Sequence, residues 1–543
     1  MFTYLPRSRL FTMGAAVALA GSFIVGSASS TSADDGTDTS AAGTAAPATT
    51  TTGTIRPLTG AAGPSSVSVS VRDAAARAVV ALRDSTDLAT TDPAARANQA
   101  PISGAGGDAG ETVARDSSTE LLAIGRNFRN TRAQAVSSTL AEPAAANDFS
   151  EVFYSGNTYN SYSANHGATW SAQAVHAGPA EANIPCCDAD VVHHAPTDTT
   201  FASLLYVNSA TTNGVVDIEV RRGSPNAVDC IYRIDPGGTA NNVLPDYPHM
   251  AVTNGFLFLS TNNNGPTGWT GANTRRFNVS QMSQCQTASF TSFNYVGTVG
   301  QRVHVPGETQ AGVTCEYWAQ YENSSTIRWF QWCDSSASVN QFTRATTATN
   351  FVNPDCRGGT GNFDFIERST AWSITGFRGR TAVGGGQVAF FINAAADASH
   401  PQAHLHGQAI SRSTLAVIAN PVVFNSSSCF GFPALGSNSR NDLGLSVAFG
   451  GRAGGGGTAA RGYVGVDDAS SAGIFFPTVT LTANGTHNRS DSRFGDYFTV
   501  RGNDQCVGSW TATNYALLNG NTLPSHVNAR YVEFRSTSQA ACP

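Results

Sequence analysis

Lysine is absent from this 543-residue sequence, and all 32 basic residues are arginine. This absence excludes Schiff-base and lysine-nucleophile chemistry. Charge of either sign is also scarce, because only 13% of the residues are charged and the formal net charge is -6. Nucleic-acid binding calls for clustered Lys and Arg, and an anionic lipid surface calls for a basic stripe, so we expect neither partner.

Long apolar runs are missing after the N-terminus. No later run approaches the roughly 18 apolar residues of a spanning helix, so no membrane domain is expected. Residues 1–30 contain Arg7 and Arg9, an apolar segment at 13–25 and small residues at 26–28. This pattern is typical of an export signal, although an uncleaved anchor remains an alternative. We therefore predict a secreted protein with no membrane span once the signal is cleaved.

Several catalytic signatures are also absent. The sequence has no His-Glu-x-x-His, no Gly-x-Ser-x-Gly and no dinucleotide fingerprint, which disfavours zincins, α/β-hydrolases and Rossmann enzymes. The glycine-rich stretches at 384–386 and 450–457 lack the Lys and the helix of a phosphate loop, so hairpin turns are expected there. No cofactor is predicted.

Ten cysteines are present, which fits an oxidising compartment and up to five disulfides. Two pairs are candidate staples because they flank a strand pair and bracket the terminal segment, respectively: Cys315 with Cys333, and Cys506 with Cys542. A disulfide between Cys506 and Cys542 would covalently close the terminal segment of the fold. The adjacent Cys186 and Cys187 do not easily pair in ordinary geometry, so each is expected to find a distant partner.

The N-terminal part has little to bury. Residues 31–65 are mostly Ala, Thr, Gly, Ser and Asp, which predicts a disordered linker. A strand at 67–71 and a helical turn or two at 74–82 would give a short ordered segment within a linker that ends at 118. Whether 66–145 is a pro-segment or stalk, or an ordered strand with a disordered linker, is left open by the sequence.

From 119 to 543 the chain alternates short apolar or aromatic runs with Gly, Asn, Pro and Asp turns, which is typical of an all-β protein. Strand signals recur about every 8 to 15 residues and favour a β-propeller over a sandwich, because radial blades add strands without an exposed edge. We predict a monomeric propeller of six or seven blades. The clearest strands are 152–154, 201–207, 215–220, 256–260, 327–332, 372–377, 388–392, 443–449 and 463–466.

One turn carries a family resemblance. At 163–170 the sequence Ser-Ala-Asn-His-Gly-Ala-Thr-Trp follows a strand rich in aromatic residues. It resembles the Asp-box (BNR repeat), Ser-x-Asp-x-Gly-x-Thr-Trp, of sialidase-like β-propellers, with Asn165 where that family usually has Asp. The family's box marks the fold and is not catalytic, since Gly permits the tight turn and Trp plugs the blade.

Further segments resemble secreted bacterial Asp-box proteins of the sialidase-like superfamily, in the same order. They are Cys-Asp-Ala-Asp-Val-Val-His at 187–193, Leu-Pro-Asp-Tyr-Pro-His at 244–249 leading into Phe-Leu-Phe-Leu-Ser-Thr-Asn at 256–262, Phe-Asn-Val-Ser-Gln-Met at 277–282, Phe-Asp-Phe-Ile-Glu-Arg-Ser at 363–369, Arg-Phe-Gly-Asp-Tyr at 493–497, and a closing Cys-to-Cys segment at 506–542. The resemblance spans roughly 150–543. It implies a protein that binds or hydrolyses extracellular carbohydrate or glycoprotein.

If the protein is an enzyme, the resemblance implies an exo-sialidase-like glycoside hydrolase. Sialidases use three arginines, a Tyr paired with Glu as nucleophile, an Asp acid/base and an Arg-Ile-Pro segment, and this last segment is absent here. The alternative is a non-catalytic propeller that binds glycan or protein at the cell surface. A third hypothesis is a metal-dependent hydrolase or lyase that uses Asp188, Asp190 and histidines.

The catalytic candidates are mainly carboxylates. Asp188 and Asp190 stand two residues apart, so on a strand both face one side and could share a proton, bind a cation or flank a sugar; alternatively they accept backbone N–H bonds that hold a loop. Glu316 and Glu367 are candidate partners, because glycoside cleavage needs two carboxyls about 5 to 10 Å apart. The full catalytic set is Asp188, Asp190, Asp246, Tyr247 and Glu367.

Binding candidates lie in two loops. In the Asp-Tyr-Pro-His loop, Tyr247 could stack on a sugar or act as nucleophile, with Asp246 or His249 as its base, unless the loop only packs over a strand. In the second loop, Arg493, Asp496 and Tyr497 could bind a charged sugar, or Arg493 could latch to Asp496.

His400, His404 and His406 have a spacing that suggests a metal site. Because no acid stands near them in a recognisable motif, we expect them to be exposed loop residues instead. No metal site is predicted.

Overall fold

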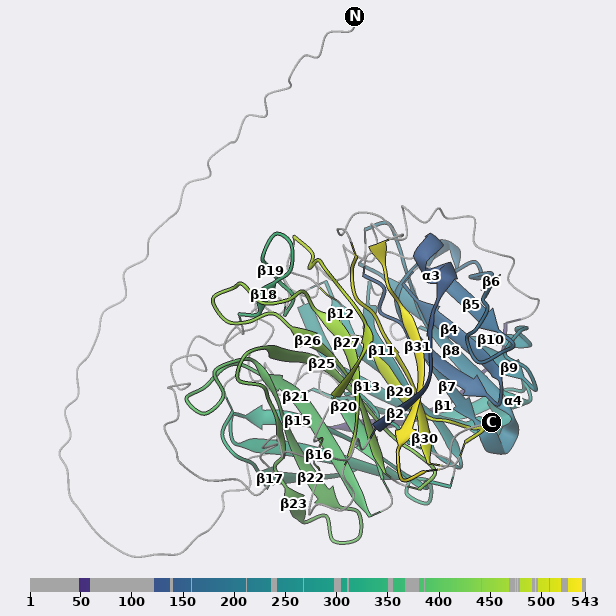
Figure 1. Cartoon of the computed structure of the whole chain (residues 1–543). Helices are drawn as coiled ribbons and strands as arrows, with labels where there is room; N and C mark the ends of the chain where they lie inside the picture. The colour runs from purple at the N-terminus through teal and green to yellow at the C-terminus, as the bar shows by residue number, and fades with distance from the viewer. Residues whose placement is uncertain are drawn as a thin grey trace, which may run out of the picture. The chain divides into compact units, whose positions relative to one another are not determined.

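Seven antiparallel sheets of three to five strands make up the folded part of the computed structural model (Figure 1). The model describes residues 48–58 and 122–543, except 137–139, 158, 211, 236–241, 267, 297–303, 310–311, 350–354, 367–379, 385, 441, 468–473, 475, 477–478, 491–493, 495–496, 507, 519–525 and 540–543. The predicted signal peptide, the segment at 67–82 and the strand at 372–377 lie outside these residues. No helix among the described residues is long and apolar enough to cross a membrane.

The first four sheets follow one another along the chain, and within each sheet consecutive strands are neighbours. The first contains β3 (Ala144–Asp148), β4 (Glu151–Gly156), β5 (Tyr159–Ser163) and β6 (Ser171–Gln173). The second contains β7 (Ile184–His194), β8 (Thr199–Val207), β9 (Gly214–Arg222) and β10 (Cys230–Ile234). The third contains β11 (Leu244–Val252), β12 (Phe256–Gly265), β13 (Gly268–Asn278) and β14 (Ala288–Tyr295), and the fourth contains β15 (Cys315–Asn323), β16 (Thr326–Cys333) and β17 (Asn340–Ala345).

The last three sheets complete the ring. The fifth contains β20 (Arg380–Val383), β21 (Gln387–Ala394) and β22 (His404–Ser411), with β23 (Val417–Ala419) and β24 (Val422–Val423) both paired to β22. The sixth contains β25 (Cys429–Ser437), β26 (Leu443–Gly450), β27 (Arg461–Val466) and β28 (Val479–Ala483), and the seventh contains β29 (Thr499–Gly502), β30 (Ser509–Asn514), β31 (Arg530–Ser536) and β2 (Leu122–Arg129). Short elements lie in the connections. Between blades these are η1 (Ala180–Ala182), α3 (Thr131–Val136) and the hairpin of β18 (Arg357–Gly358) and β19 (Phe363–Asp364), and within blades η2 (Ala195–Thr197) joins β7 to β8 and α4 (Val279–Ser283) joins β13 to β14.

The first strands of successive sheets contact one another around a common centre, from β3 to β7, β7 to β11, β15 to β20, β20 to β25, β25 to β29 and β29 back to β3. The stretch before β15 joins the fourth sheet to the fifth, because Gly307 N–H donates to the Tyr317 carbonyl and Glu308 N–H to the Thr381 carbonyl. These contacts define a seven-bladed β-propeller and confirm the predicted all-β fold. The predicted strands among the described residues all lie within observed ones.

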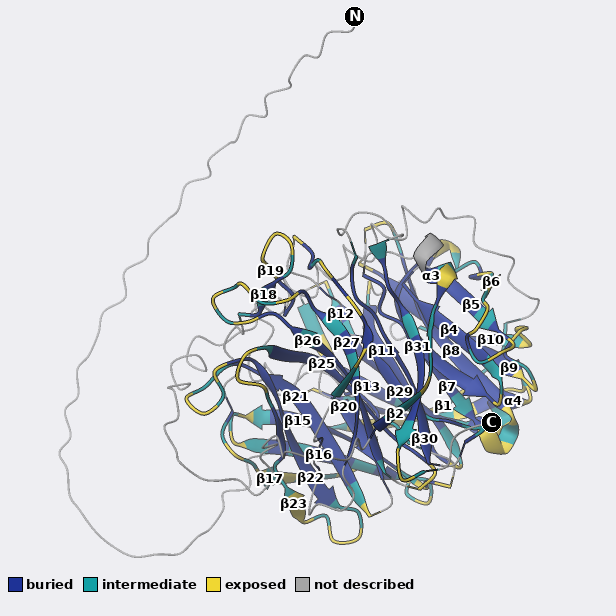
Figure 2. Ribbon diagram, in the orientation of Figure 1, coloured by how far each residue is buried: buried dark blue, intermediate teal, exposed yellow. Residues whose placement is uncertain are grey.

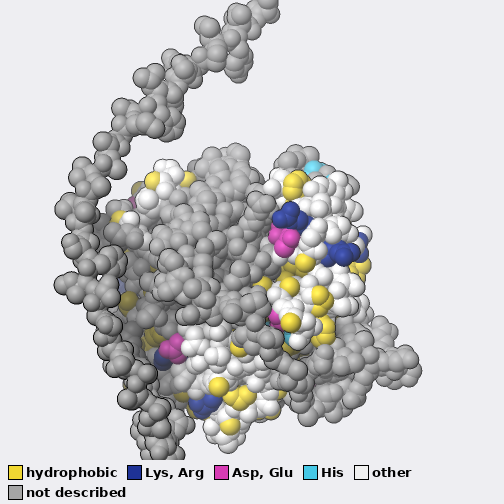
Figure 3. Space-filling model, turned by 90° about the vertical axis from the view of Figure 1, so that its left-hand side faces the viewer, with side chains coloured by type: hydrophobic (Ala, Val, Ile, Leu, Met, Phe, Trp, Pro, Cys, Tyr) yellow, Lys and Arg dark blue, Asp and Glu magenta, His cyan; other side chains and the backbone are white. Residues whose placement is uncertain are grey.

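The ring closes through strand β2, which pairs with β31 in the last blade although more than 400 residues separate some of the paired positions (Figure 1). Figure 2 shows that the strands are largely buried and that exposure is concentrated in the connections and in outer strands such as β6 and β23. On the face drawn in Figure 3 the described charged side chains are scattered, and no basic stripe is present among them.

The turn at 163–170 is held by hydrogen bonds to Asn165 and packs its Trp170 between two blades. Trp170 packs edge-on against Tyr154 of the first blade and Tyr531 of the last, with centroid distances of 5.4 and 6.2 Å. The Asn165 Oδ1 accepts hydrogen bonds from the Thr169 N–H at 2.8 Å and from its hydroxyl at 3.1 Å. Because only this oxygen is used in these contacts, an Asp at this position could accept the same hydrogen bonds.

The prediction that 31–65 is disordered is wrong at β1 (Thr49–Ile55). This strand pairs with β14 over seven residues and adds a fifth strand to the third blade. An edge strand such as β14 leaves a row of backbone donors and acceptors without partners. The β-branched Thr residues of β1 favour an extended strand, which can pair with this edge without needing an apolar face of its own. The sequence alone does not reveal such an edge.

Four disulfides join described cysteines: Cys186–Cys187, Cys230–Cys285, Cys315–Cys333 and Cys356–Cys429. The third confirms a predicted staple. The prediction that Cys186 and Cys187 each find a distant partner is wrong, because the register shift between Pro185 and Cys187 gives this part of β7 an irregular backbone in which adjacent sulfurs meet. Cys506 is also disulfide-bonded, and Cys542, its predicted partner, lies outside the described residues.

Candidate functional site

Three inner strands share one backbone irregularity. The register of β7, β11 and β25 shifts against the next strand, and in each a non-glycine residue has positive φ: Asp188 (57°), Tyr247 (57°) and Phe432 (53°). Such a conformation costs of order 1–2 kcal/mol, and a bulge re-aims the side chains around it. The alternation of side chains between the two faces is therefore interrupted at the same place in three blades.

A side chain holds the backbone of each of these residues. The Asp188 N–H donates to Asn157 Oδ1 at 2.9 Å, and the Tyr247 N–H donates to Asp188 Oδ2 at 3.2 Å. The Phe432 N–H donates to Asn393 Oδ1 at 3.0 Å. Every acceptor belongs to the preceding blade or to its hairpin connection, so the irregular backbone depends on contact between blades.

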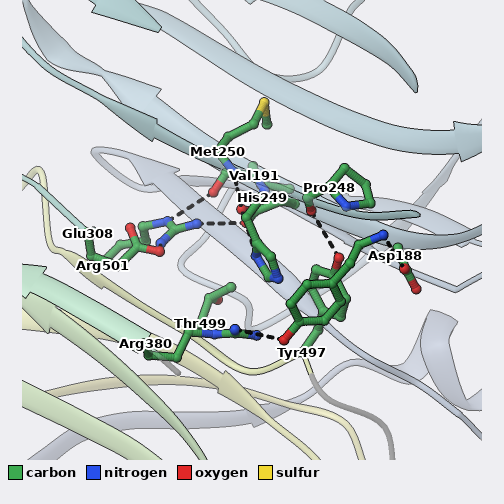
Figure 4. A network of polar contacts seen from close by, with 12 residues as sticks. Asp188, Val191, Pro248, His249, Met250, Glu308, Arg380, Tyr497, Thr499 and Arg501 are labelled. Atoms are coloured by element: carbon green, nitrogen blue, oxygen red, sulfur yellow. Dashed lines mark hydrogen bonds and ion pairs between the residues drawn. The ribbon is translucent and has the colours of Figure 1, made fainter. Parts of the chain in front are cut away.

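Three aromatic rings meet beside these bulges. Tyr247 and His249 come from β11, and Tyr497 lies just before β29. The His249 ring stacks on Tyr497 at 4.4 Å (Figure 4). Tyr247 is edge-on to both rings. Arg380, the first residue of β20, donates from Nη1 to the Tyr247 hydroxyl at 2.8 Å. The Tyr497 hydroxyl donates to the Pro248 carbonyl at 2.9 Å. All four side chains are at most 5% exposed. We call these four residues the axial cluster.

The carboxylates beside the axial cluster are engaged by the protein. Asp190 accepts the Met250 N–H on Oδ2 at 2.8 Å and Arg501 Nη2 on Oδ1 at 2.7 Å, and its Oδ2 lies 3.6 Å from His249 Nδ1. Burial alone would raise the pKa of Asp190, but Arg501, His249 and the Met250 N–H together hold it below the ordinary value. Asp190 is therefore a carboxylate at neutral pH, and Arg501 also pairs with Glu308.

Asp188 and Asp190 both accept backbone N–H groups of β11, so they hold a strand of the next blade in place. Asp246 is 1% exposed and lies opposite Asn262 in the β11–β12 register. Burial raises the pKa of Glu316 well above its ordinary value, although the Tyr317 and Gly307 N–H groups donate to it. The other predicted site residues, Glu367, Arg493 and Asp496, lie outside the described residues.

A cavity of about 180 Å³ opens toward the other end of the inner strands. It is lined by the last residues of β7 and β11 and by Arg501, Asn503 and Asp504. The axial cluster belongs to the beginnings of the inner strands, whereas this cavity belongs to their ends. Arg501 and Glu308 line the cavity and pair with each other, and Arg501 also pairs with Asp190, so one ion network joins the two regions.

Two groups of side chains among the described residues have metal-ligand geometry, and neither belongs to the axial cluster. They are Asp397 with His400 and His404, and Asp148 with His193 and Asp198. In the second group, burial and then the neighbouring Asp198 and Asp504 raise the pKa of Asp148 to about 7. The prediction of exposed histidines is wrong for His404 and His406, which lie buried in β22 at 1% and 3% exposure.

Sequence reasoning did not find Arg380, Arg501, Glu308 or Asn157. Each lies in an ordinary strand or loop, such as Thr-Val-Arg-Gly around Arg501, and no motif marks it. Arg380 is 133 residues from Tyr247, and Arg501 is 311 residues from Asp190. Only closure of the ring brings these partners together.

No family model matches this sequence, and no curated protein aligns with it significantly. Solved structures with distant similarity include the α-L-arabinanase of Penicillium chrysogenum complexed with arabinobiose, at 9% identity and a TM-score of 0.34, covering 73% of this chain and 93% of that one. The sialidase of Trypanosoma rangeli has 10% identity and a TM-score of 0.32 and covers 57% of this chain, which spans 52% of that protein.

The NanB sialidase of Streptococcus pneumoniae has 9% identity and a TM-score of 0.30, with 74% of this chain and 69% of that one covered. Similarities of this size carry no argument about activity. The propeller assignment rests on the sheet topology instead.

Proposed function

We propose that this protein recognises extracellular glycans at the end of the ring where the axial cluster lies. The observation that carries the proposal is the convergence of Tyr247, His249, Tyr497 and Arg380 from three separate segments at the beginnings of the inner strands. The cluster is at most 5% exposed, so its part in the proposal is to hold this end of the ring in one shape; aromatic and guanidinium groups suit such a place because they also bind sugar C–H faces and hydroxyls. Ligand sites combine such apolar surfaces with a few placed polar groups.

The composition and covalent structure support the extracellular setting. Four described disulfides persist only in an oxidising environment, and the predicted export signal provides the route to it. Low charge favours a neutral or weakly acidic ligand over a polyanion.

Hydrolysis of the bound glycan by an exo-sialidase-like route is the second candidate. It is favoured by the contact between Arg380 and the Tyr247 hydroxyl, with Asp188 bonded to the backbone of the same tyrosine. A tyrosine nucleophile and a nearby carboxylate are what the family resemblance implies. Against this candidate, both oxygens of Asp190 already hold protein donors.

A glycan array combined with a panel of fluorogenic glycosides separates the two candidates. We expect wild-type protein to bind a subset of glycans and Arg380→Met and Tyr497→Phe to weaken binding by about tenfold or more, since each removes a hydrogen bond that holds the axial cluster in place. Arg222→Gln is the matched control, because Arg222 is 47% exposed in a surface ion pair with Asp229. Wild-type protein that binds no glycan on the array contradicts the proposal.

Turnover that disappears in Tyr247→Phe while binding persists would establish hydrolysis. Binding without turnover, unchanged in Asp188→Asn and Asp246→Asn, would leave recognition alone.

A further inference from the structure

A second chemical site lies in the connection between β21 and β22. It consists of Asp397 and His400 in the connection and His404, the first residue of β22. Each contributes one potential ligand atom, and these three atoms lie within 4.8 Å of one another. The site is distinct from the axial cluster, and its argument does not depend on the proposed glycan recognition.

The separations fit a metal ion. His400 Nδ1 lies 3.0 Å from Asp397 Oδ1, and His404 Nε2 lies 3.8 Å from Asp397 Oδ2. Tetrahedral zinc with bonds of about 2.0–2.2 Å places its ligand atoms about 3.3–3.5 Å apart. The observed distances bracket this value, so a small side-chain adjustment would bring all three atoms onto one ion.

His404 is already oriented as a ligand. Its Nδ1 lies 3.2 Å from the Gln402 carbonyl, which can only accept, so the proton is assigned to Nδ1 and the lone pair to Nε2. That lone pair is directed to the Asp397 side, at a distance too long for a hydrogen bond. The ring is 1% exposed, and a backbone bond of this kind fixes metal-binding histidines in many proteins.

The site can be reached from solvent. Asp397 and His400 remain 27% and 17% exposed, which leaves a route for an ion to enter.

We propose that Asp397, His400 and His404 bind a zinc ion and leave its fourth coordination position open to water or to an oxygen atom of a ligand. Two imidazoles and one carboxylate suit zinc, whereas calcium takes oxygen ligands. Iron(II) also uses two histidines and a carboxylate, but the disulfides indicate an oxidising setting in which zinc is the stable divalent ion.

The zinc site lies on the fifth blade, which also carries Arg380 of the axial cluster. Arg380 pairs with Phe391 in the β20–β21 ladder, and β21 runs on to Ala394, immediately before the connection that holds Asp397. The zinc site therefore lies at the same end of the fifth blade as Arg380 of the axial cluster. It is a separate site at the face where glycan recognition is proposed.

Zinc titration of the full chain tests the proposal. After removal of metals with a chelator, calorimetry and elemental analysis should show one zinc per wild-type chain. Asp397→Asn and His400→Gln should weaken zinc binding by about 100-fold or more, since loss of a supporting contact alone costs 10–100-fold. Cobalt(II), used as a spectroscopic probe, should give the visible absorption of a tetrahedral site in wild type only.

Two controls make the result specific. His487→Gln removes a half-buried histidine outside the site and should leave zinc binding unchanged. Asp198→Asn removes a carboxylate of the other ligand group and keeps a side chain that tolerates the left-handed backbone at this position (φ 47°). No stoichiometric zinc in wild type, unchanged binding in both site variants, or loss in Asp198→Asn alone would each overturn the proposal.

Discussion

Replacing His176 with Gln should remove a pH-dependent part of this protein's stability. His176 follows β6, the outer strand of the first blade, and bonds to two residues of β9 in the second blade. Its Nε2 lies 2.9 Å from Asp217 Oδ2, and its Nδ1 lies 2.8 Å from Glu219 Oε1. Arg233 binds Asp217 and Arg221 binds Glu219, so the histidine completes a buried ion network between two blades.

The magnitude follows from the pKa. Burial alone would lower the pKa of His176, but the hydrogen bonds to Asp217 and Glu219 outweigh it and raise the pKa from 6.5 to about 9. The charged imidazolium is therefore favoured in the folded state by about 3 kcal/mol. Because the folded pKa is raised, this contribution is fully present below pH 6.5 and is lost as the pH rises through 9.

Urea unfolding of wild type and His176→Gln across about pH 6 to 9.5 measures this effect. The variant should be about 3 kcal/mol less stable at pH 6, and the difference should shrink toward zero at the alkaline end. Subtracting the unfolding free energy of the variant from that of wild type at each pH cancels the titrations of the groups that both proteins share. His487→Gln controls for the loss of a histidine outside the network. A difference that stays constant over this range would refute the assignment of a charged, paired His176.

Three further predictions concern the ring. Asp190→Asn should destabilise the protein by about 3–5 kcal/mol in thermal unfolding, because it leaves Arg501 buried beside a neutral group. The loss of stability at acid pH that the lowered pKa of Asp190 predicts for wild type should be absent in this variant. Gly436→Ala should cost about 1–3 kcal/mol, since a Cβ there would lie 2.4 Å from a backbone oxygen of the next blade, whereas Gly386→Ala, with nothing within 4 Å, should be neutral. Asn165→Asp should change stability by less than about 0.5 kcal/mol, since one oxygen makes the turn contacts, and a loss beyond about 1 kcal/mol would show that the amide nitrogen matters.

The architecture was predictable from local sequence because each strand carries its own signal. Segments such as 201–207 and 443–449 lie within β8 and β26, where apolar and β-branched residues suit a buried strand whatever its partner. Features that depend on a distant partner were not predictable. Strand β1 needs the free edge of β14, and the Cys186–Cys187 disulfide needs the local irregularity of β7.

The candidate site was predictable only in part for the same reason. Tyr247, His249 and Tyr497 stand in segments rich in Pro, Gly and aromatic residues, which is a local signal, although the predicted loop around Tyr247 and His249 is in fact part of strand β11. Arg380 and Arg501 carry no such signal, because the sequence around a single arginine in a strand looks the same whether its side chain faces solvent or a buried carboxylate. Asp397 was overlooked as a metal ligand since its relation to His404 depends on the path of the connection between β21 and β22.

The repeated bulge explains why the site and the ring depend on each other. Asp188 and Tyr247 adopt a conformation that an isolated strand would avoid, and each is held by an acceptor from the preceding blade, Asn157 for the first and Asp188 for the second. Asp188 is thus held by Asn157 and itself holds Tyr247, so the positioning of these residues depends on the first blade, then the second, then the third. Since the cost of each positive φ is offset only when the neighbouring blade is in place, the geometry around Tyr247 is a property of the closed ring.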